Sequence, residues 1–236
     1  MSTKTAPLVL CLATQNRHKV AELQALLATL APELLTRVTL TSLGELGISE
    51  EVVEDGSTFA DNAIIKAKAA CERTGLWALS DDSGLQVEAL GGGPGIHSAR
   101  WAGEPRSDER NLAKLLTELG HVPPDQRQAR FTCALCLYGQ PAGQAQPQIV
   151  VREGACRGSL RDTVAGGGGF GYDPLFVPDP AELAAAGLAE SRRGLTFAEL
   201  AAEEKNRLSH RTRALVALLP DLHDAAGLGR VGKVIA

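Results

Sequence analysis

The chain has 236 residues with a net charge of −4 at pH 7, and 44% of them are hydrophobic and 22% charged. This composition is that of an ordinary folded protein and not of a disordered or collagen-like chain, and the acidic balance argues weakly against a non-specific nucleic-acid binder. No apolar run approaches the roughly 18 residues of a membrane helix, and the N-terminal segment lacks the apolar region of a secretion signal. We therefore expect a cytoplasmic protein with no membrane or nucleic-acid partner.

The cysteines point to the same compartment. They are odd in number and mostly lie inside apolar runs, which favours buried free thiols under reducing conditions. Cys133 and Cys136 are three residues apart in a segment that alternates like a strand, so their side chains face opposite sides and do not hold one metal ion.

Apolar runs and helical patterns alternate along the first part of the chain. Leucines at helical spacing after the first strand predict a helix with Asn16 as its N-cap. The third strand ends at two adjacent carboxylates, Asp81 and Asp82. The predicted strands are residues 8–13, 36–41 and 76–80, and the second predicted helix covers 58–73.

The second half predicts a strand pair and a terminal helix. Alternation over 129–138 predicts a strand, and 148–152 predicts its partner across a mobile loop. The last helix is predicted over 209–219, with Ser209 as N-cap and Pro220 as its stop. Further predicted features are a helix at 107–119, glycine-rich loops at 91–95 and 166–169, an exposed insertion with some helix at 179–195, and a loosely held tail at 221–236.

The segment TQNRHK, residues 14–19, lies between the first strand and its helix. Free backbone amides and the positive end of the helix dipole at such a turn can bind an anion. Lys19, one turn into the helix, adds a full charge. An ordinary capped helix with a solvated lysine is the alternative.

Asp81 and Asp82 follow a buried strand, at the place where α/β sheets bind their ligands. Mg²⁺ prefers one or two carboxylates together with substrate phosphates, so the pair is a candidate metal site. Asp61, in the first turn of the preceding helix, could add a third carboxylate. The alternatives are a polar turn and an acidic residue that only stabilises a helix N-terminus.

Two later segments could also bind a ligand. The glycine run 166–169 lets the backbone approach a ligand closely, and the aromatic residues Phe170 and Tyr172 that follow can stack on a flat ring. A flexible surface loop is the alternative. Cations around the start of the last helix, including His210 and Arg211, oppose the helix dipole, which favours an anionic or carbonyl-rich ligand over a merely solvated face.

Together these segments supply phosphate-binding amides, lysines, up to three carboxylates, an aromatic loop and a His–Arg pair. That set describes a metal-assisted site for a nucleoside triphosphate, if the fold brings distant segments together. The chain lacks the GxxxxGK[ST] pattern, which excludes a P-loop ATPase.

Six blocks occur in order between residues 8 and 219: LATQNRHKVAEL, TFADNAIIKAKAA, ALSDDSGLQVEALGGGPGIHSARWAG, DQRQARFTCAL, GGGGFGYDPLF and EEKNRLSHRTRAL. Together they resemble the signature blocks of the Ham1/RdgB inosine triphosphate pyrophosphatases. The resemblance implies an α/β fold with a long mixed central β-sheet flanked by helices, and two lobes with an active-site cleft between them. We expect this as one domain over residues 1–220, with a tail at 221–236. It also implies a homodimer that hydrolyses ITP, dITP and XTP to the monophosphate and pyrophosphate with Mg²⁺.

The resemblance further implies roles for single residues. Asp82 is implied as the general base for a water that attacks the α-phosphorus. The implied metal ligands are Asp61, Asp82 and Asp81. The implied substrate contacts are Thr14, Gln15, Asn16, Arg17, His18, Lys19 and Lys66 at the phosphates, then Ser83, then Phe170, Gly171, Tyr172 and Asp173 over the base, and Lys205, His210 and Arg211 around the rest of the nucleotide.

Some positions depart from the family pattern. Asp61 stands where the family usually has glutamate, and its shorter arm would reach Mg²⁺ through a water and weaken the metal site. Val164 replaces a common proline before the glycine loop, which makes that loop less rigid. Residues 179–195 and the tail after Pro220 carry no implied role.

Two other functions stay open: a pyrophosphatase for other modified nucleotides, and a nucleotide-binding regulator without turnover. The paired carboxylates argue against the regulator, because repelling acids contribute little to holding a polyanion. Hydrogen-bond donors from His210, Arg211 or the nearby backbone would match a 6-oxo purine and mismatch adenine. A panel of nucleotides with Mg²⁺ separates these functions.

Overall fold

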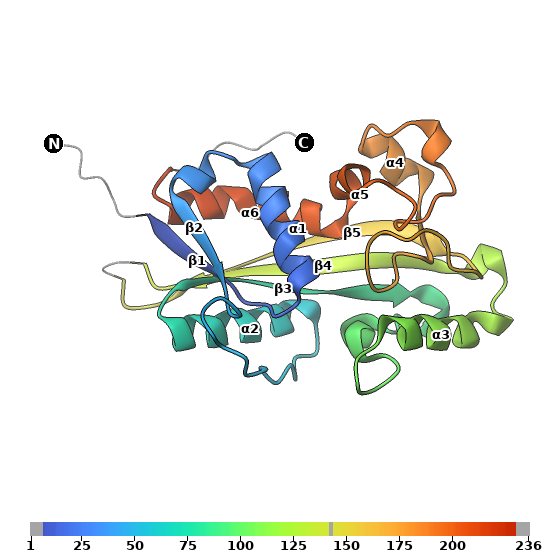
Figure 1. Cartoon of the computed structure of the whole chain (residues 1–236), viewed down its shortest axis with the longest axis horizontal. Coiled ribbons are helices and arrows are strands. Elements are labelled where there is room, and N and C mark those ends of the chain that lie inside the picture. Colours follow the sequence, from blue (N-terminus) through green and yellow to red (C-terminus); the bar gives the residue numbers. More distant parts are fainter. Residues whose placement is uncertain (1–6, 142–143, 230–236) are drawn as a thin grey trace. The chain divides into compact units, whose positions relative to one another are not determined.

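Among residues 7–141 and 144–229, which the computed structural model describes, six strands form one mixed sheet in the order β2-β1-β3-β4-β5-β6. The strands are β1 (Leu8–Leu12), β2 (Val38–Ser42), β3 (Trp77–Val87), β4 (Gln128–Gly139), β5 (Gln148–Leu160) and β6 (Phe176–Pro178). β1 is parallel to β2 and to β3 (Figure 1). β5 and β6 are antiparallel. The prediction of an α/β fold with a mixed central sheet is confirmed.

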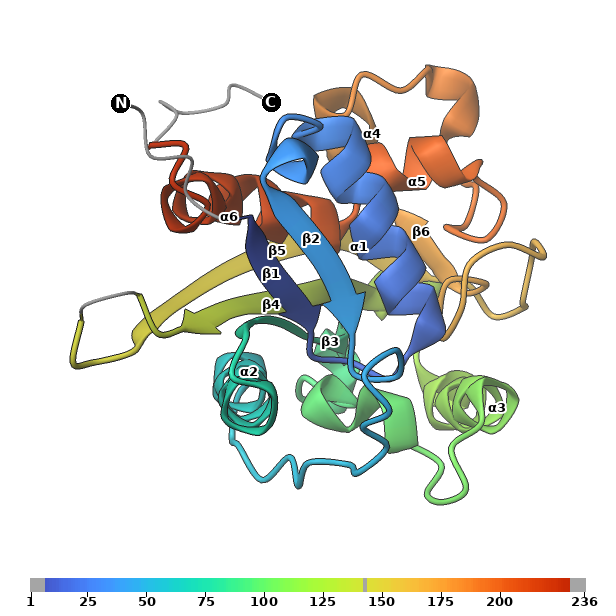
Figure 2. The same cartoon turned by 60° about the vertical axis from the view of Figure 1, so that its left-hand side comes forward.

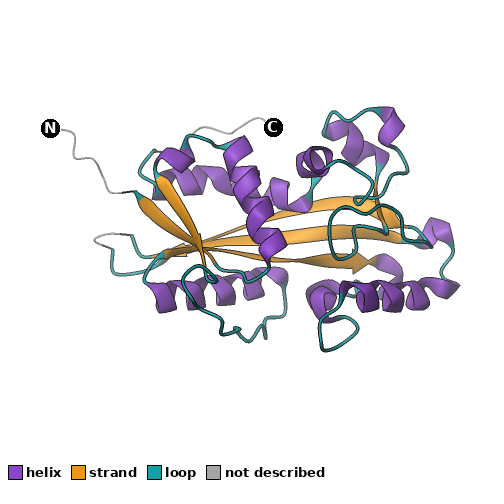
Figure 3. Ribbon diagram, viewed as in Figure 1, coloured by secondary structure: helices purple, strands orange, loops and turns teal. Residues whose placement is uncertain are grey.

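Helices flank the strands, as the ribbon coloured by secondary structure shows (Figure 3). Their starts follow local sequence: Asn16, Thr58 and Ser107 cap the first three helices with their side chains. The predicted N-cap at Asn16 is therefore confirmed. The α-helices are α1 (Arg17–Leu30), α2 (Phe59–Thr74), α3 (Asp108–Glu118), α4 (Pro180–Ala185), α5 (Ala202–Leu208) and α6 (His210–Ala225), and the short 3-10 helices are Leu34–Thr36, Glu88–Leu90, Gly95–Arg100, Leu119–His121, Pro124–Gln126 and Glu190–Arg192. None of the helices in this described part combines the length and the apolarity that crossing a bilayer requires.

The chain divides into two compact units, and β3, β4 and β5 each contribute residues to both. Unit 1 holds the described residues of Met1–Asp82, Ala134–Glu153 and Ala214–Ala236, and unit 2 holds Ser83–Cys133 and Gly154–Arg213. In unit 1, β1 and β2 run side by side, with α1 and α2 on opposite sides of these strands (Figure 2). The prediction of one domain over residues 1–220 stays a prediction.

Aromatic rings fill the core of unit 2. The Phe176 ring lies 4.7 Å from that of Phe131 and 4.8 Å from that of Phe197, measured between centroids. Leu85 and Val87, at the end of β3, belong to the same cluster. Edge-on and tilted packing of this kind adds to the free energy of burying such rings, and it fixes the segments that carry the polar residues of unit 2.

The predicted end of the third strand is wrong. β3 does not stop at Asp81 but continues to Val87. Side chains alternate between the two sides of a strand, and the carboxylates of Asp81 and Asp82 each pair with a lysine on their own side. The buried acids are thereby neutralised, so the chain stays extended through them.

The predicted stop of the last helix at Pro220 is also wrong. Ser209 caps α6 as predicted, because its Oγ accepts from the Thr212 N–H at 3.2 Å, but the helix continues to Ala225. Proline inside a helix removes one hydrogen bond. Burial of Leu222, which is 1% exposed, and an ion pair of 2.8 Å between Arg152 and Asp221 hold the last turns in place. The start of the predicted tail is therefore helical, and residues 230–236 lie outside the described residues.

Candidate active site

The turn between β1 and α1 carries the first group of predicted ligands. Asn16 Oδ1 accepts from the amides of His18 and Lys19 at 3.0 and 3.2 Å, and the Asn16 N–H donates to Thr14 Oγ1 at 3.2 Å. These amides are engaged in capping, so the expectation that they are free is wrong. A pocket of about 650 Å³ opens beside the turn, and Thr14, Gln15 and Arg17 contribute to its lining.

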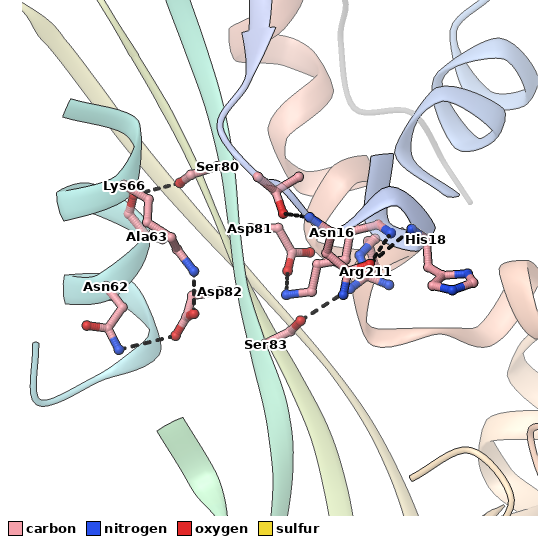
Figure 4. Close-up of polar contacts among 12 residues, drawn as sticks. Asn16, His18, Asn62, Ala63, Lys66, Ser80, Asp81, Asp82, Ser83 and Arg211 are labelled. Carbon is pink, nitrogen blue, oxygen red and sulfur yellow. Dashed lines mark hydrogen bonds and ion pairs between the residues drawn. The ribbon is translucent and has the colours of Figure 1, made fainter. Parts of the chain in front are cut away.

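Asp81 and Asp82 point to opposite sides of β3, because side chains alternate along a strand (Figure 4). Asp81 forms an ion pair with Lys19 of α1, and its side chain is fully buried. Asp82 Oδ1 lies 2.5 Å from Lys66 Nζ of α2. The fold of unit 1 thus pairs the two carboxylates with different lysines, one 62 positions and the other 16 positions earlier in the chain.

Asn62 and Glu54 also belong to the surroundings of Asp82, and the sequence analysis missed both. Glu54 Oε2 lies 3.5 Å from Lys66 Nζ, so one ammonium group serves two carboxylates. The buried Asn62 accepts from the Gly56 N–H at 2.9 Å and donates to Asp82 Oδ2 at 3.4 Å (Figure 4). It links the loop that carries Glu54 to Asp82. The acidic run around Glu54 could have pointed to a further carboxylate at the site, but no spacing rule relates this run to β3.

Burial raises the pKa of Asp82 above its usual range. The charges of Lys66 and Lys19 and the hydrogen bond from Lys66 oppose this effect, and the negative charge of Glu54 adds to it. A carboxylate with a raised pKa accepts a proton more readily near neutral pH than an ordinary one. Such a perturbed carboxyl group between charged partners is typical of catalytic sites.

Asp61 has a structural role at the start of α2. Its Oδ2 accepts from Ser57 Oγ at 2.9 Å and from the Thr58 N–H at 3.1 Å, which completes a capping box. Hydrogen bonds from these residues lower the pKa of Asp61. Within the described residues, no three His, Cys, Asp or Glu side chains form a metal-ligand group, so Asp61, Asp81 and Asp82 are not brought together as one set.

The donor set around Lys66 nevertheless fits Mg²⁺. This ion takes one or two protein carboxylates when substrate phosphates supply further oxygens. Asp82 and Glu54 are two carboxylates that already share one cationic group, the ammonium of Lys66. They are hard oxygen donors of the kind that the ion requires.

In unit 2, Asp173 contacts two other predicted ligands, Phe170 and Lys205. Its Oδ2 accepts from the Phe170 N–H and from Lys205 Nζ, each at 2.8 Å. Lys205 Nζ lies 4.9 Å from the centroid of the Phe170 ring. The backbone of Phe170 and the side chain of the buried Lys205 are therefore held by the same carboxylate.

Ser83 and Arg211 meet in the same unit. Arg211 Nη2 donates to Ser83 Oγ at 3.2 Å (Figure 4), and Arg211 Cζ lies 5.9 Å from the Phe170 ring centroid. The neighbouring His210 is buried and stacks on the Phe131 ring with centroids 4.9 Å apart. His210 and Arg211, at the start of α6, thus both lie beside aromatic rings.

Tyr172 and Phe170 differ in what they can contact. Tyr172 is 4% exposed, and its hydroxyl donates to Ser98 O at 2.9 Å, so its ring belongs to the core. Phe170 is partly exposed. Of the two rings that the sequence offered for stacking, Phe170 is the one that a ligand can reach.

Gly169 is required by the backbone of this loop. Its φ is +70°, and a Cβ would lie 2.1 Å from Asp173 Oδ2. We expect Gly169→Ala to lower the free energy of unfolding in urea by about 1–3 kcal/mol. Gly167→Ala is the matched control, because its Cβ would meet no atom within 4 Å and its φ is not positive. Equal destabilisation in both variants would contradict the assignment.

Known proteins are similar to this chain in sequence over most of its length. The family model described as Ham1 family matches residues 10–221. A curated relative from Geobacillus kaustophilus (strain HTA426), named dITP/XTP pyrophosphatase, is 47% identical over 208 residues, which are 88% of this chain and 90% of the relative. A relative of the same name from Xanthomonas campestris pv. campestris (strain 8004) is 44% identical over 214 residues, or 91% of this chain and 96% of the relative.

Solved structures agree in fold. The Ham1 protein of Staphylococcus aureus superposes with a TM-score of 0.72 at 34% identity, covering 92% of this chain and 98% of its own. A structure from Mycobacterium abscessus, described as a nucleoside-triphosphatase and dITP/XTP pyrophosphatase, superposes with a TM-score of 0.66 at 42% identity. The match covers 90% of this chain and 100% of that one. Both similarities span nearly the whole chain.

Proposed function

Because this chain belongs to the Ham1 family, we propose that it hydrolyses the non-canonical purine nucleoside triphosphates ITP, dITP and XTP to the nucleoside monophosphate and pyrophosphate. Removal of such nucleotides cleanses the nucleotide pool. The observation that carries the proposal is that the two adjacent carboxylates of β3 pair with different lysines, Asp81 with Lys19 and Asp82 with Lys66. Relatives named dITP/XTP pyrophosphatase, at 44–48% identity over most of the chain, support dITP and XTP as substrates.

Asp82 is the proposed general base. A water oxygen bonds to the α-phosphorus, the bond from that phosphorus to the bridging oxygen breaks, and pyrophosphate leaves with the bond's electron pair. The water proton passes to the Asp82 carboxylate. The raised pKa of Asp82 and the Asn62 donor on its second oxygen support this role.

Mg²⁺ is the proposed cofactor, with Asp82 and Glu54 as its ligands. When bound, this ion neutralises the charge that builds up on the leaving pyrophosphate. Asp61 and Asp81 were predicted as further ligands, but the capping box and the Lys19 ion pair engage them. We therefore propose that Asp81 positions Lys19. The proposed phosphate contacts are Lys19, Lys66 and the other residues of the α1 turn, 14–19.

The polar groups of unit 2 are the proposed contacts to the nucleoside. Phe170 stacks on the purine, while donors of Lys205, His210 and Arg211 match a 6-oxo group. Adenine would place a donor against them and leave buried groups unpaired. The carboxylate that joins Phe170 to Lys205 supports this assignment.

We expect the purified protein to release pyrophosphate from ITP, dITP and XTP with Mg²⁺ and to lose this activity when EDTA is added. ATP should be a poor substrate, since adenine places a hydrogen-bond donor against the buried donors of the site. We expect this mismatch to lower kcat/KM at least about 10-fold and by up to several orders of magnitude. A preference for ATP or for modified pyrimidine nucleotides would contradict the purine assignment. Binding of ITP without pyrophosphate release would indicate a regulator.

The proposed assembly is a cytoplasmic homodimer, as the family resemblance implies. The described part of the chain contains no helix suited to a membrane, and the five cysteines are free thiols. Light scattering of the purified protein measures its oligomeric state, and a monomeric mass would contradict the dimer.

A further inference from the structure

Two carboxylates clamp consecutive amides of the glycine-rich loop in unit 2. The Phe170 N–H donates to Asp173 Oδ2 at 2.8 Å, and the next amide, that of Gly171, donates to Asp108 Oδ2 at 2.7 Å. Asp173 belongs to the same loop. Asp108 is the first residue of α3 and lies 63 positions earlier in the chain.

Asp108 is not needed to cap its own helix. Ser107 is the N-cap of α3, and its Oγ accepts from the Arg110 N–H at 3.2 Å. The carboxylate of Asp108 faces the loop instead, where it accepts the Gly171 N–H. This contact of the Asp108 carboxylate therefore lies outside α3.

The loop needs external contacts because glycines give its backbone little stiffness. Gly166, Gly169 and Gly171 all have positive φ, at +83°, +70° and +61°. Phe170 stands between Gly169 and Gly171 in the sequence. Lys205 Nζ and Arg211 Cζ lie over its ring, 4.9 and 5.9 Å from the centroid. A shift of the backbone at Gly171 would move the ring relative to both cations.

We propose that Asp108 is a positioning residue of the nucleotide site, which fixes the Gly171 amide and thereby the place of the Phe170 ring. The inference rests on the proposed function, since it takes Phe170 as the stacking partner of the purine. Asp108 itself touches neither substrate nor reacting atoms. It sets how well the base is held, and the chemical step at the α-phosphorus does not depend on it.

The test compares three variants with the wild-type protein in steady-state hydrolysis of ITP. Asp108→Ala is expected to raise KM about five- to tenfold, the size of effect that loss of one typical hydrogen bond of about 1 kcal/mol produces, with kcat within about twofold. Asp108→Asn keeps an oxygen acceptor and is expected to restore KM to within about twofold. Glu109→Ala is the matched control, because Glu109 lies in the same first turn of α3, and it should leave KM unchanged.

Thermal midpoints of all variants show whether folding is affected, and the affinity for IMP by calorimetry checks base binding without turnover. An unchanged KM in Asp108→Ala, a loss of kcat equal to the rise in KM, or no rescue by Asp108→Asn overturns the inference. If one of these outcomes occurs while the wild-type protein hydrolyses ITP, only the inference about Asp108 fails and the proposed function stands. If the wild-type protein releases no pyrophosphate from any 6-oxo purine nucleotide, the proposed function and the inference both fail.

Discussion

Asp82→Asn is expected to lower kcat for ITP at least about 100-fold, the usual contribution of a general base. Asparagine has the same shape as aspartate but cannot accept the water proton. It also replaces a charged carboxylate of the proposed metal site by a neutral amide, so the Mg²⁺ concentration for half-maximal activity should rise. Pyrophosphate release over a range of Mg²⁺ concentrations measures both effects.

Asp81→Asn is the matched control for this variant. Asp81 precedes Asp82 on β3, is also buried and is likewise paired with a lysine, but it points to the other side of the strand (Figure 4). We expect a change mainly in KM, because Lys19 loses the partner that places it. Near-normal turnover of Asp82→Asn, or equal losses of kcat in the two variants, would remove Asp82 from the role of base.

Lys66→Met is expected to lower kcat/KM about 100-fold or more, since the phosphate contact that we propose for its ammonium group is lost. A second effect follows from the position of Lys66 Nζ, which lies 2.5 Å from Asp82 and 3.5 Å from Glu54. Without the ammonium group the two carboxylates are no longer neutralised. The nucleotide-free variant should therefore bind Mg²⁺ about tenfold more tightly than the wild-type protein, as measured by calorimetry.

The same substitution leaves Asp82 buried without its main partner, which destabilises a fold. The thermal midpoint of Lys66→Met should fall without Mg²⁺ and recover in part when Mg²⁺ is added. Lys68→Met is the control, because Lys68 lies on the same helix, its side chain is 55% exposed, and it pairs with Glu72 at 3.9 Å. Weaker Mg²⁺ binding by Lys66→Met than by the wild-type protein would show that Glu54 and Asp82 do not form the metal site.

The local features of this protein could be predicted because they depend on neighbouring residues. Asn16 and Ser209 are caps whose side chains contact amides two or three positions away, and such spacing is visible in the sequence. Helix α2 and strand β4 follow their apolar periodicity closely. The resemblance to one family rested on ordered blocks, and the family model covers the same stretch of chain.

Several contacts of the candidate site could not be predicted from local spacing. The Lys19–Asp81 pair spans 62 positions, and the Gly171–Asp108 contact spans 63. Glu54 lies in a loop without a motif, and only the packing of α2 places Lys66 beside it and Asp82. Asp61 looked like a metal ligand by its charge, whereas its position three residues after Thr58 makes it part of a capping box.

By itself, the sequence determined the caps, the periodic helices and strands, and the family, since each of these depends on residue types at short or fixed spacing. The tertiary structure alone decided which lysine neutralises which carboxylate, that β3 stays extended through two acids, and that α6 continues past Pro220. The physical reason is that ion pairing and burial act between segments that only the packed chain brings within a few ångströms. Their free energy can outweigh a local signal for a turn or a helix stop.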